Sequence, residues 1–384
     1  MNVLIIGGTG VLSSAVTAEA LKQGMCVTMI NRGNRRIPEG VELIKSDKDD
    51  LNYIAKQLDG RMFDAVMDYL CYTDSQTEKS VRFYQKYAKQ YFYISSCAVY
   101  NTELLAGKMA DEGSPKVLPI WKYSVDKWAS EQKIEKLFEG SKVKYTIIRP
   151  CVTYGDTRIP YGISPIYGYH WTLAARILAG KPIIIWNEGK NRCNMTRVED
   201  FAVGVVGLIG NEKAYGEAFN VCGDEVPTFR EVLDVMSDYL HKEVITVDVR
   251  SEFYAKELPS RAGEILGGRS IDTINSNAKL KAAVPAFKQT YSLREGVFKT
   301  LDAYKAQGYQ HGIDWKFDGD TDRIIKKWSK VQGKDLNQYN LGFMDYLSNA
   351  AIGDKIKYWF VFHNLYNIYI LLNRVSIFLK KYLR

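Results

Sequence analysis

The stretch Asn2-Val-Leu-Ile-Ile-Gly-Gly-Thr-Gly-Val-Leu-Ser-Ser14 decides the fold of this chain. Its first five residues form an apolar run rich in β-branched side chains, which predicts a buried strand. Gly7-Gly8-Thr9-Gly10 follows at once, and apolar residues at helical spacing come next. A strand that runs through a glycine turn into a helix gathers backbone N–H groups and the positive end of a helix dipole at one point. That point suits a pyrophosphate.

The spacing Gly7-x-x-Gly10-x-x-Ser13 departs from the simplest dinucleotide fingerprint, G-x-G-x-x-G. Ser13 is still small enough for close packing of helix on strand, which is the role of the third glycine. Glycines in such a turn also serve backbone conformation alone. The position of this turn directly after the first strand favours dinucleotide binding.

The composition is that of a globular protein of one or two domains, with 384 residues, 46% of them hydrophobic and 25% charged. The net charge of +8 allows an anionic partner: nucleic acid, a phosphorylated small substrate or a membrane surface. The six cysteines contain no C-x-x-C pair, so we expect reduced, buried thiols, mostly in strands, and a cytoplasmic protein. A strand that begins at residue 2 predicts that no signal peptide precedes it.

Apolar runs and helical patterns alternate along the first 150 residues. We expect strands at 26–30, 41–47, 63–68, 91–94 and 143–150, and helices that include 51–58 and 75–89. This alternation implies right-handed βαβ units and an α/β fold, a Rossmann-type doubly wound parallel sheet. The expected domains are a dinucleotide-binding domain (1–155), a smaller, discontinuous substrate-binding portion that returns to the Rossmann sheet (156–305) and a C-terminal helical tail (306–384).

The end of the second strand, Asn31-Arg-Gly-Asn-Arg-Arg36, bears on the choice of cofactor. In dinucleotide folds an acid at this position binds the ribose 2′-hydroxyl of NAD, whereas an arginine accommodates the 2′-phosphate of NADP. No acid is present here, so Arg32, Arg35 and Arg36 favour NADP over NAD. A solvated basic loop is the alternative interpretation.

Two further segments carry candidate chemistry. Ser95, Ser96 and Cys97 follow a predicted strand, where ligands of open α/β sheets bind. Tyr123 and Lys127 lie four residues apart in a predicted helix and therefore on one face of it. A lysine ammonium beside a phenol favours the phenolate, which lets the tyrosine act as an acid or base nearer neutral pH.

These motifs resemble those of the extended short-chain dehydrogenase/reductases of the NAD-dependent epimerase/dehydratase type. The resemblance rests on GGTG at 7–10, Asp47, SSCAVY at 95–100, YSVDK at 123–127, IIRPCVTYG at 147–155 and TRVEDFA at 196–202. The segments 267–287 and 293–304 resemble a sugar-epimerase-like subgroup related to the chloroplast stem-loop-binding proteins. Together they cover residues 1 to about 305.

The resemblance implies a role for each matching residue. Ser96 would hydrogen-bond the reacting sugar hydroxyl or carbonyl, Tyr123 would donate or accept the proton, and Lys127 would bind the nicotinamide ribose and lower the pKa of the phenol. The cofactor, NADP or NAD, would lie against Gly7, Thr9, Gly10, Val11, Leu12, Asn31, Arg32, Arg35, Asp47, Tyr123, Lys127, Pro150 and Val152. No metal is expected.

Departures from the family pattern limit the reactions that we expect of this chain. Dehydratases of the family carry an Asp-Glu pair where this chain has Cys97-Ala98, so dehydration is not expected. A further hypothesis is that Cys97 and His170 act as an acid/base pair. The alternative interpretation is that Cys97 is a packed thiol and His170 an ordinary pocket histidine.

The arginine that clamps a substrate diphosphate in nucleotide-sugar enzymes is replaced by Cys193. The neighbouring Arg192, together with Arg197 and Arg261, are the candidate substrate-binding residues. Arg269 is a further candidate. For Arg261 and Arg269 the alternative interpretation is an ordinary surface residue.

Residues 356–383 are aromatic and apolar, with His363, Asn367, Arg374 and Lys381 at helical spacing along one stripe. Polar residues interrupt the segment too often for a membrane span. One amphipathic helix that contacts a membrane surface, or that packs on the domain or in a dimer, is expected instead.

The leading hypothesis is a cytoplasmic enzyme that oxidises or reduces a sugar carbon with NAD(P); a location peripheral to a membrane is the alternative that its tail allows. We expect a nucleotide sugar as substrate, a 4-epimerase or 4-ketoreductase activity, a setting such as polysaccharide biosynthesis, and a homodimer. The competing hypothesis is a non-catalytic relative that binds RNA, which the charge allows; because Ser96, Tyr123 and Lys127 are intact, nucleic acid is not the expected partner.

Overall fold

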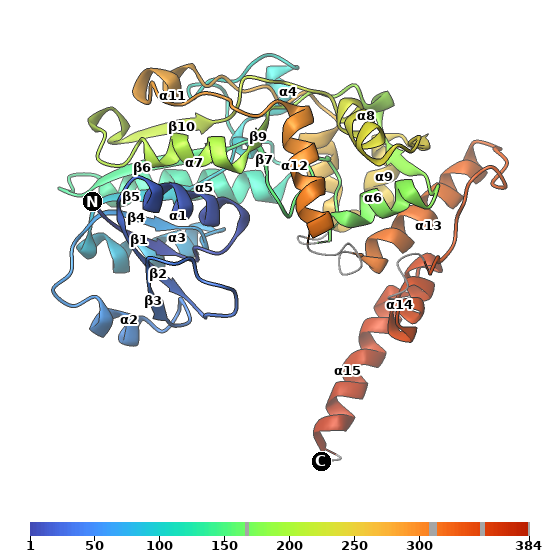
Figure 1. Cartoon of the computed structure of the whole chain (residues 1–384), viewed down its shortest axis with the longest axis horizontal. Helices are drawn as coiled ribbons and strands as arrows, with labels where there is room; N and C mark the ends of the chain where they lie inside the picture. The colour runs from blue at the N-terminus through green and yellow to red at the C-terminus, as the bar shows by residue number, and fades with distance from the viewer. Residues whose placement is uncertain (166–168, 307–312, 346–349, 383–384) are drawn as a thin grey trace. The chain divides into compact units, whose positions relative to one another are not determined.

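The computed structural model describes residues 1–165, 169–306, 313–345 and 350–382. The chain forms two compact units, each assembled from separate stretches of sequence, and Figure 1 follows the elements along it. Unit 1 comprises Met1–Gly155, Asn191–Pro227 and Leu266–Gly296. Unit 2 comprises Asp156–Lys190, Thr228–Ile265 and Val297–Arg384.

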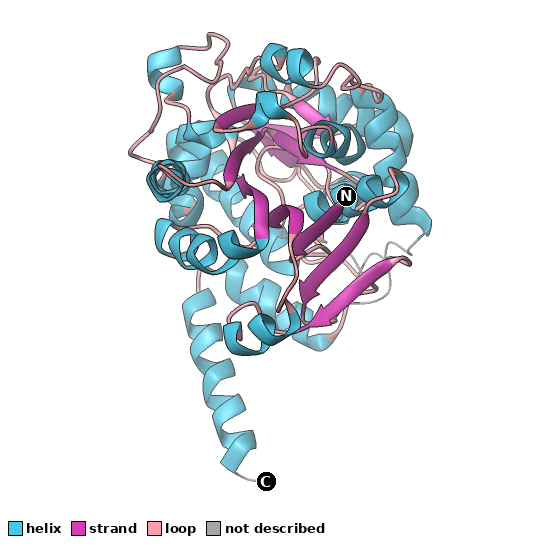
Figure 2. Ribbon diagram, turned by 90° about the vertical axis from the view of Figure 1, so that its left-hand side faces the viewer, coloured by secondary structure: helices cyan, strands magenta, loops and turns pink. Residues whose placement is uncertain are grey.

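A seven-stranded parallel sheet forms the centre of unit 1, and its strands are visible in Figure 2. The strand order is β10-β6-β5-β4-β1-β2-β3, so the order reverses between β1 and β4, where ligands of such sheets bind. The predicted Rossmann-type fold is therefore confirmed. The strands are β1 (Asn2–Ile6), β2 (Cys26–Asn31), β3 (Val41–Lys45), β4 (Phe63–Asp68), β5 (Ala88–Ile94), β6 (Lys144–Pro150) and β10 (Glu217–Val221).

Helices cover both faces of this sheet because its central strands are apolar on both sides. Val3 and Ile5 of β1 belong to a core with α1, α7 and α11, whereas Leu4 and Ile6 belong to a second core with α2, α3 and α5. The helices of unit 1 are α1 (Val11–Lys22), α2 (Leu51–Gln57), α3 (Asp74–Tyr84), α4 (Thr102–Leu105), α5 (Lys122–Phe138), α7 (Val198–Val206) and α11 (Ala278–Ala283). The short strands β7 (Val152–Tyr154) and β9 (Met195–Arg197) pair beside the sheet.

Two expectations about unit 1 were wrong in detail. The helix expected over 75–89 ends at Tyr84, and β5 already begins at Ala88. Gln90 lies inside this strand because its side chain donates to Thr146 and to the carbonyl of Leu208, so a polar residue is accommodated in the core. None of the six cysteines forms a disulfide, but Cys26 is exposed, and it is the only one of the six that lies within a strand.

Unit 2 is mainly helical, with one two-stranded parallel ladder between β8 and β11. Its helices position a cluster of buried charges, described below. The elements are α6 (Trp171–Leu178), β8 (Ile183–Ile185), α8 (Phe229–Leu240), β11 (Thr246–Asp248), α9 (Ser251–Glu257), α10 (Ala262–Glu264), α12 (Leu293–Ala306, which begins in unit 1), α13 (Trp315–Val331), α14 (Ile352–Phe362) and α15 (Tyr366–Tyr382).

The segment 356–383 does not form the one helix that its sequence led us to expect. α14 ends at Phe362, and α15 begins at Tyr366. Between them Asn364 adopts a left-handed backbone conformation (φ +61°), which stops an α-helix and reverses its last turn. Among the described residues, none of the helices has the length and apolar character that crossing a bilayer requires.

Candidate active site

The glycine turn after β1 has the shape that a close approach of the backbone requires. Gly7 and Gly8 both have positive φ, at +105° and +72°. A Cβ at Gly8 would come within 2.4 Å of the Met29 side chain, which would have to move, and the positive φ would strain a larger residue there. Gly10 is the N-cap of α1 and brings no side-chain acceptor, and Ser13 accepts its N–H at 2.9 Å. The N-terminus of α1 therefore faces this turn without an acid in its first turn.

Side chains after β2 hold the turn in place. The Asn31 amide donates to the carbonyl of Gly7 at 3.1 Å, and its oxygen accepts the N–H of Gly33 at 2.7 Å. Arg35 donates to the carbonyl of Thr9 at 2.7 Å. Arg32 and Arg35 are exposed, so a cluster of positive charge borders the glycine turn.

Other residues expected at the cofactor also lie in unit 1. Asp47 is exposed just after β3, where it caps the turn by accepting the N–H of Asp49. Pro150 ends β6, and Val152 is buried at the start of β7.

Tyr123 and Lys127 occupy one face of α5, as their spacing predicts. The phenol of Tyr123 is partly exposed, and the Lys127 ammonium lies 5.9 Å from the centre of its ring. Lys127 itself is buried and donates to the carbonyls of Cys71 and Ile94, at 2.9 and 2.7 Å. Ile94 is the last residue of β5, so Lys127 reaches the carboxyl end of the sheet. Burial lowers the pKa of Lys127 to about 8.

Ser95 and Ser96 follow β5 directly but face different environments. Ser96 begins a short helical turn, where its hydroxyl accepts the N–H of Ala98 at 3.1 Å and remains half-buried. Ser95 is buried and donates to the carboxylate of Glu131 at 2.5 Å. Ser96 is therefore the serine whose hydroxyl is accessible at this strand end.

Glu131 and Arg149 form an ion pair in the interior of unit 1. Both side chains are buried, with Glu131 0% exposed, and Arg149 donates two hydrogen bonds to the carboxylate, at 2.6 and 3.0 Å. Glu131 lies one helical turn beyond Lys127 on α5, and Arg149 lies near the end of β6. The pair thus links the helix that carries Tyr123 to the strands beneath it.

The same network continues toward β10. Arg149 also donates to the hydroxyl of Tyr100 at 3.0 Å, and that hydroxyl donates to Asn220 at 2.6 Å. Cys97 donates to the carbonyl of Arg149 at 3.2 Å. Burial raises the pKa of the Cys97 thiol well above its ordinary value, so the thiol is neutral near pH 7.

His170 lies in unit 2, at the start of α6, whereas Cys97 belongs to unit 1. The imidazole is buried, and its Nδ1 accepts the N–H of Ile159 at 3.1 Å. Burial, with the charge of Arg158 as a second cause, lowers the pKa of His170 to about 3. The ring is therefore neutral at physiological pH.

The candidate substrate-binding arginines are each paired with an acid of the chain. Arg192 binds Asp272 at 2.9 Å, and the buried Arg197 binds Glu199 at 2.8 Å. In unit 2, Arg261 binds Glu264 at 2.8 Å and donates to the carbonyl of Ser164 at 2.6 Å. Within the described part of the chain, no cluster of three or more His, Cys, Asp or Glu has the geometry of a metal site.

Glu131, Arg149, Tyr100 and Asn220 were not among the residues singled out from the sequence. The sequence offers a local indication for two of these residues. Glu131 continues the four-residue spacing of Tyr123 and Lys127, and Arg149 is a charged residue inside an apolar strand pattern. Neither signal identifies its partner, because the two residues meet only in the folded sheet.

The match to family models identifies the class of this fold and site. Residues 3–222 match the NAD dependent epimerase/dehydratase family, and the chain therefore belongs to that family. Enzymes of this family depend on NAD, and residues beyond 222 lie outside the match.

Individual relatives are distant. The chain is 27% identical over 244 residues to the chloroplast stem-loop binding protein of 41 kDa b of Arabidopsis thaliana, covering 59% of this chain and 60% of that protein. It is 19% identical to the 2′-dehydrokanamycin reductase of Streptomyces kanamyceticus, over 67% of this chain and 72% of that enzyme.

Solved structures agree on the fold. The UDP-glucuronic acid 4-epimerase of Bacillus cereus, in complex with UDP-glucuronic acid and NAD, superposes with a TM-score of 0.63 at 17% identity. The likeness covers 80% of this chain and all of the epimerase.

Proposed function

We propose that this protein is an NAD(P)-dependent enzyme that oxidises or reduces a sugar carbon, C4 of a nucleotide sugar. The proposal rests on one observation: Lys127 is buried at the carboxyl end of β5, one helical turn behind a partly exposed Tyr123, with Ser96 at the same strand end. This is the arrangement that proton transfer beside a bound nicotinamide requires.

The residues present fit a dinucleotide. The turn at Gly7–Gly10 has positive φ at Gly7 and Gly8, which favours glycine, and it leads into a helix whose first turn carries no acid. Bound nicotinamide supplies the hydride chemistry. The protein orients the substrate against the cofactor and transfers the proton.

Each candidate catalytic residue then has a defined task. Tyr123 donates or accepts the proton of the reacting hydroxyl, and the Lys127 ammonium stabilises its phenolate and binds the nicotinamide ribose. Ser96 hydrogen-bonds the reacting oxygen. Cys97 and His170 are less suited to acid/base work, because burial raises the pKa of the thiol well above its ordinary value and lowers that of the imidazole to about 3. Both groups are also hydrogen-bonded to the backbone.

We propose NADP as the preferred cofactor. Asn31 occupies the strand end where an acid selects NAD, and Arg32 and Arg35 place positive charge beside it. A 2′-phosphate is doubly charged near neutral pH, and a guanidinium binds it through charge-assisted hydrogen bonds.

The class of reaction follows from what the site lacks. The position of the dehydratase Asp-Glu pair holds Cys97-Ala98, so the residues that remove water are absent from it. Both a 4-epimerase and a 4-ketoreductase need only Ser96, Tyr123 and Lys127. The similar proteins include a UDP-glucuronic acid 4-epimerase, which shares the fold, and a 2′-dehydrokanamycin reductase.

Three partners are part of this proposal: a nucleotide-sugar substrate, a second copy of the chain and a membrane surface touched by residues 356–383. Arg192, Arg197 and Arg261 remain the candidates for the substrate. Because all three already pair with acids, we expect a diphosphate either to displace one of these carboxylates or to share its arginine with it.

RNA binding without catalysis is the second candidate function. It is favoured by the match to the stem-loop binding protein and by the positive net charge. It does not account for the burial of Lys127 behind Tyr123.

Native mass spectrometry of the purified protein tests the proposal. A retained NAD or NADP, and any retained nucleotide sugar, would identify the ligands directly. Cofactor that stays bound and undergoes no net oxidation or reduction during turnover favours an epimerase, and stoichiometric consumption of NADPH favours a reductase.

Tyr123→Phe should abolish turnover while the cofactor still binds, and Tyr53→Phe, on the exposed face of α2, should leave both unchanged. Salt-sensitive RNA binding by a protein that binds neither cofactor would refute the enzyme.

A further inference from the structure

The last helix of the chain leaves an apolar surface exposed. Six side chains of α15 are between 48% and 61% exposed: Ile368, Leu371, Leu372, Val375, Phe378 and Leu379. Their spacing of three and four residues places them on one face of the helix, here called the α15 stripe. In a protein with a large interior, such a continuous apolar face indicates a binding surface.

The rest of α15 is more polar. At about 100° per residue, Asn367, Asn373 and Arg374 fall outside the α15 stripe, and all three are exposed. Ile377, which is 69% exposed, also falls on this other side. The helix is therefore amphipathic, with a wide apolar face and a polar side that carries an arginine.

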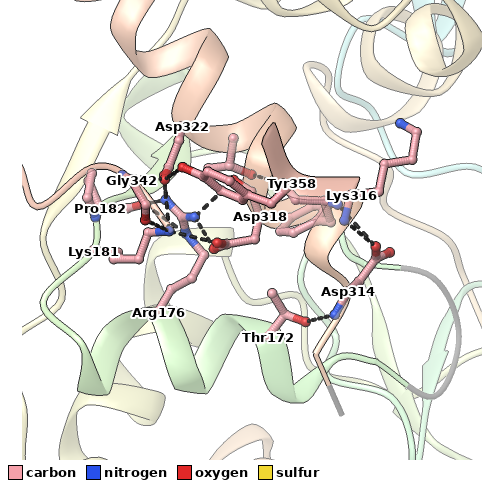
Figure 3. A network of polar contacts seen from close by, with 12 residues as sticks. Thr172, Arg176, Lys181, Pro182, Asp314, Lys316, Asp318, Asp322, Gly342 and Tyr358 are labelled. Carbon is pink, nitrogen blue, oxygen red and sulfur yellow. Dashed lines mark hydrogen bonds and ion pairs between the residues drawn. The ribbon is translucent and has the colours of Figure 1, made fainter. Parts of the chain in front are cut away.

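The preceding helix fixes this surface to unit 2. Val361 and the backbone of Tyr358 pack on Gly319 of α13, where a Cβ would come within 3.2 Å of them. The Tyr358 hydroxyl donates to Asp322 at 2.7 Å. Figure 3 shows this contact beside Arg176, Lys181 and Asp318, whose charged groups are all 0% exposed and paired with one another.

The outer face of α14 continues the apolar surface. Ile352, Ile356 and Trp359 lie at helical spacing and are 77%, 45% and 51% exposed. Tryptophan is enriched at the depth of lipid headgroups, because its ring is apolar and its N–H is polar. α14 is thus anchored by one face and open on the other.

Charge decides between a lipid surface and a second copy of the chain. No Asp or Glu follows Asp354, whereas Lys355, Lys357, Arg374, Lys380, Lys381 and Arg384 do. Helices that pair side by side usually flank their apolar seam with opposite charges. Two copies of α15 would bring only positive charges together, but an anionic lipid surface complements them.

We propose that α15 lies in the interface of an anionic membrane, parallel to its plane, with the α15 stripe inserted and Arg374 facing the headgroups. This helix of 17 residues is about 25 Å long at 1.5 Å per residue, which lies along the surface. The inference concerns the tail and is independent of the reaction that unit 1 carries out.

Vesicle flotation with the full-length protein tests it. The protein should float with vesicles of phosphatidylcholine and phosphatidylglycerol in equal parts and stay behind with phosphatidylcholine alone. Added salt should weaken the association, because it screens the attraction to the headgroups.

Two matched variants locate the surface. Leu371→Asn with Phe378→Asn should reduce binding to the anionic vesicles at least tenfold, and Ile377→Asn, the same kind of change on the other side of α15, should leave it within twofold. Both variants should keep the wild-type thermal unfolding curve, because the substituted side chains are exposed.

Equal flotation with both kinds of vesicle, or loss of binding in Ile377→Asn alone, would overturn the proposal. So would a dimer in light scattering that Leu371→Asn with Phe378→Asn turns into a monomer, since the occupant of the α15 stripe would then be a second copy. Turnover of a soluble substrate reports on the proposed enzyme separately, and neither result decides the other.

Discussion

Replacing Glu131 with glutamine should destabilise unit 1 strongly, although the size of the side chain is nearly unchanged. The Glu131 carboxylate accepts hydrogen bonds from Arg149 at 2.6 and 3.0 Å and from Ser95 at 2.5 Å, with no solvent exposure. Glu131→Gln keeps the shape and removes the negative charge. Arg149 then stays buried with only neutral acceptors: the oxygen of the new amide and two groups already in place, the Tyr100 hydroxyl and the carbonyl of Glu112.

The expected loss is about 3 kcal/mol, the lower end of the 3–5 kcal/mol that breaking a buried ion pair typically costs. The lower end applies because those two neutral acceptors remain in place. Urea unfolding followed by circular dichroism measures the loss as a shift of the transition midpoint at unchanged slope.

A double variant separates an unpaired charge from a generally damaged core. Glu131→Leu with Arg149→Met removes both charges, and apolar replacements of buried pairs are often neutral or stabilising. It should recover most of the loss, apart from about 1 kcal/mol for the hydrogen bond of Ser95. A loss below 1 kcal/mol in Glu131→Gln, or a double variant less stable than either single change, would refute the reasoning.

Three further outcomes are expected. Because the Lys127 ammonium has a pKa of about 8, its positive charge is present below that pH and lost above it. Cofactor affinity, measured by fluorescence titration, should therefore fall above pH 8 and approach a tenfold loss per pH unit. An affinity that does not change with pH would exclude the contact with the ribose. Arg35→Ser should raise the KM for NADP about ten- to a hundredfold, the equivalent of one charge-assisted hydrogen bond, and leave that for NAD nearly unchanged; equal effects on both would contradict a role at the 2′-phosphate. Cys97→Ser should keep turnover within severalfold, because a hydroxyl also donates to the carbonyl of Arg149, and loss of activity would revive Cys97 as an acid or base.

The sequence predicted the parts of the fold that depend on local patterns. The apolar run at 2–6, the glycine turn and the alternation of strands and helices each follow from short-range spacing, and together they imply the parallel sheet. Tyr123 and Lys127 were placed on one helical face by their spacing alone.

What the sequence did not predict depends on residues far apart in the chain. Arg192 pairs with Asp272, 80 positions away, and Glu131 pairs with Arg149 across a helix and a strand. The prediction of a single helix in the tail was wrong for a local reason instead. The apolar pattern continues through Asn364, and only the left-handed conformation of Asn364 divides the segment into two helices.

The face of α5 shows why these long-range pairs matter for the candidate site. Tyr123, Lys127 and Glu131 follow one another at four-residue spacing and are 37%, 3% and 0% exposed. A phenol that solvent reaches is thus followed by a buried cation, and the cation by a buried anion. Burial alone lowers the pKa of Lys127, and the negative charge of Glu131 opposes that effect. Glu131→Gln should therefore also lower the pH above which cofactor affinity begins to fall. A purely structural role for Glu131 would not produce this effect.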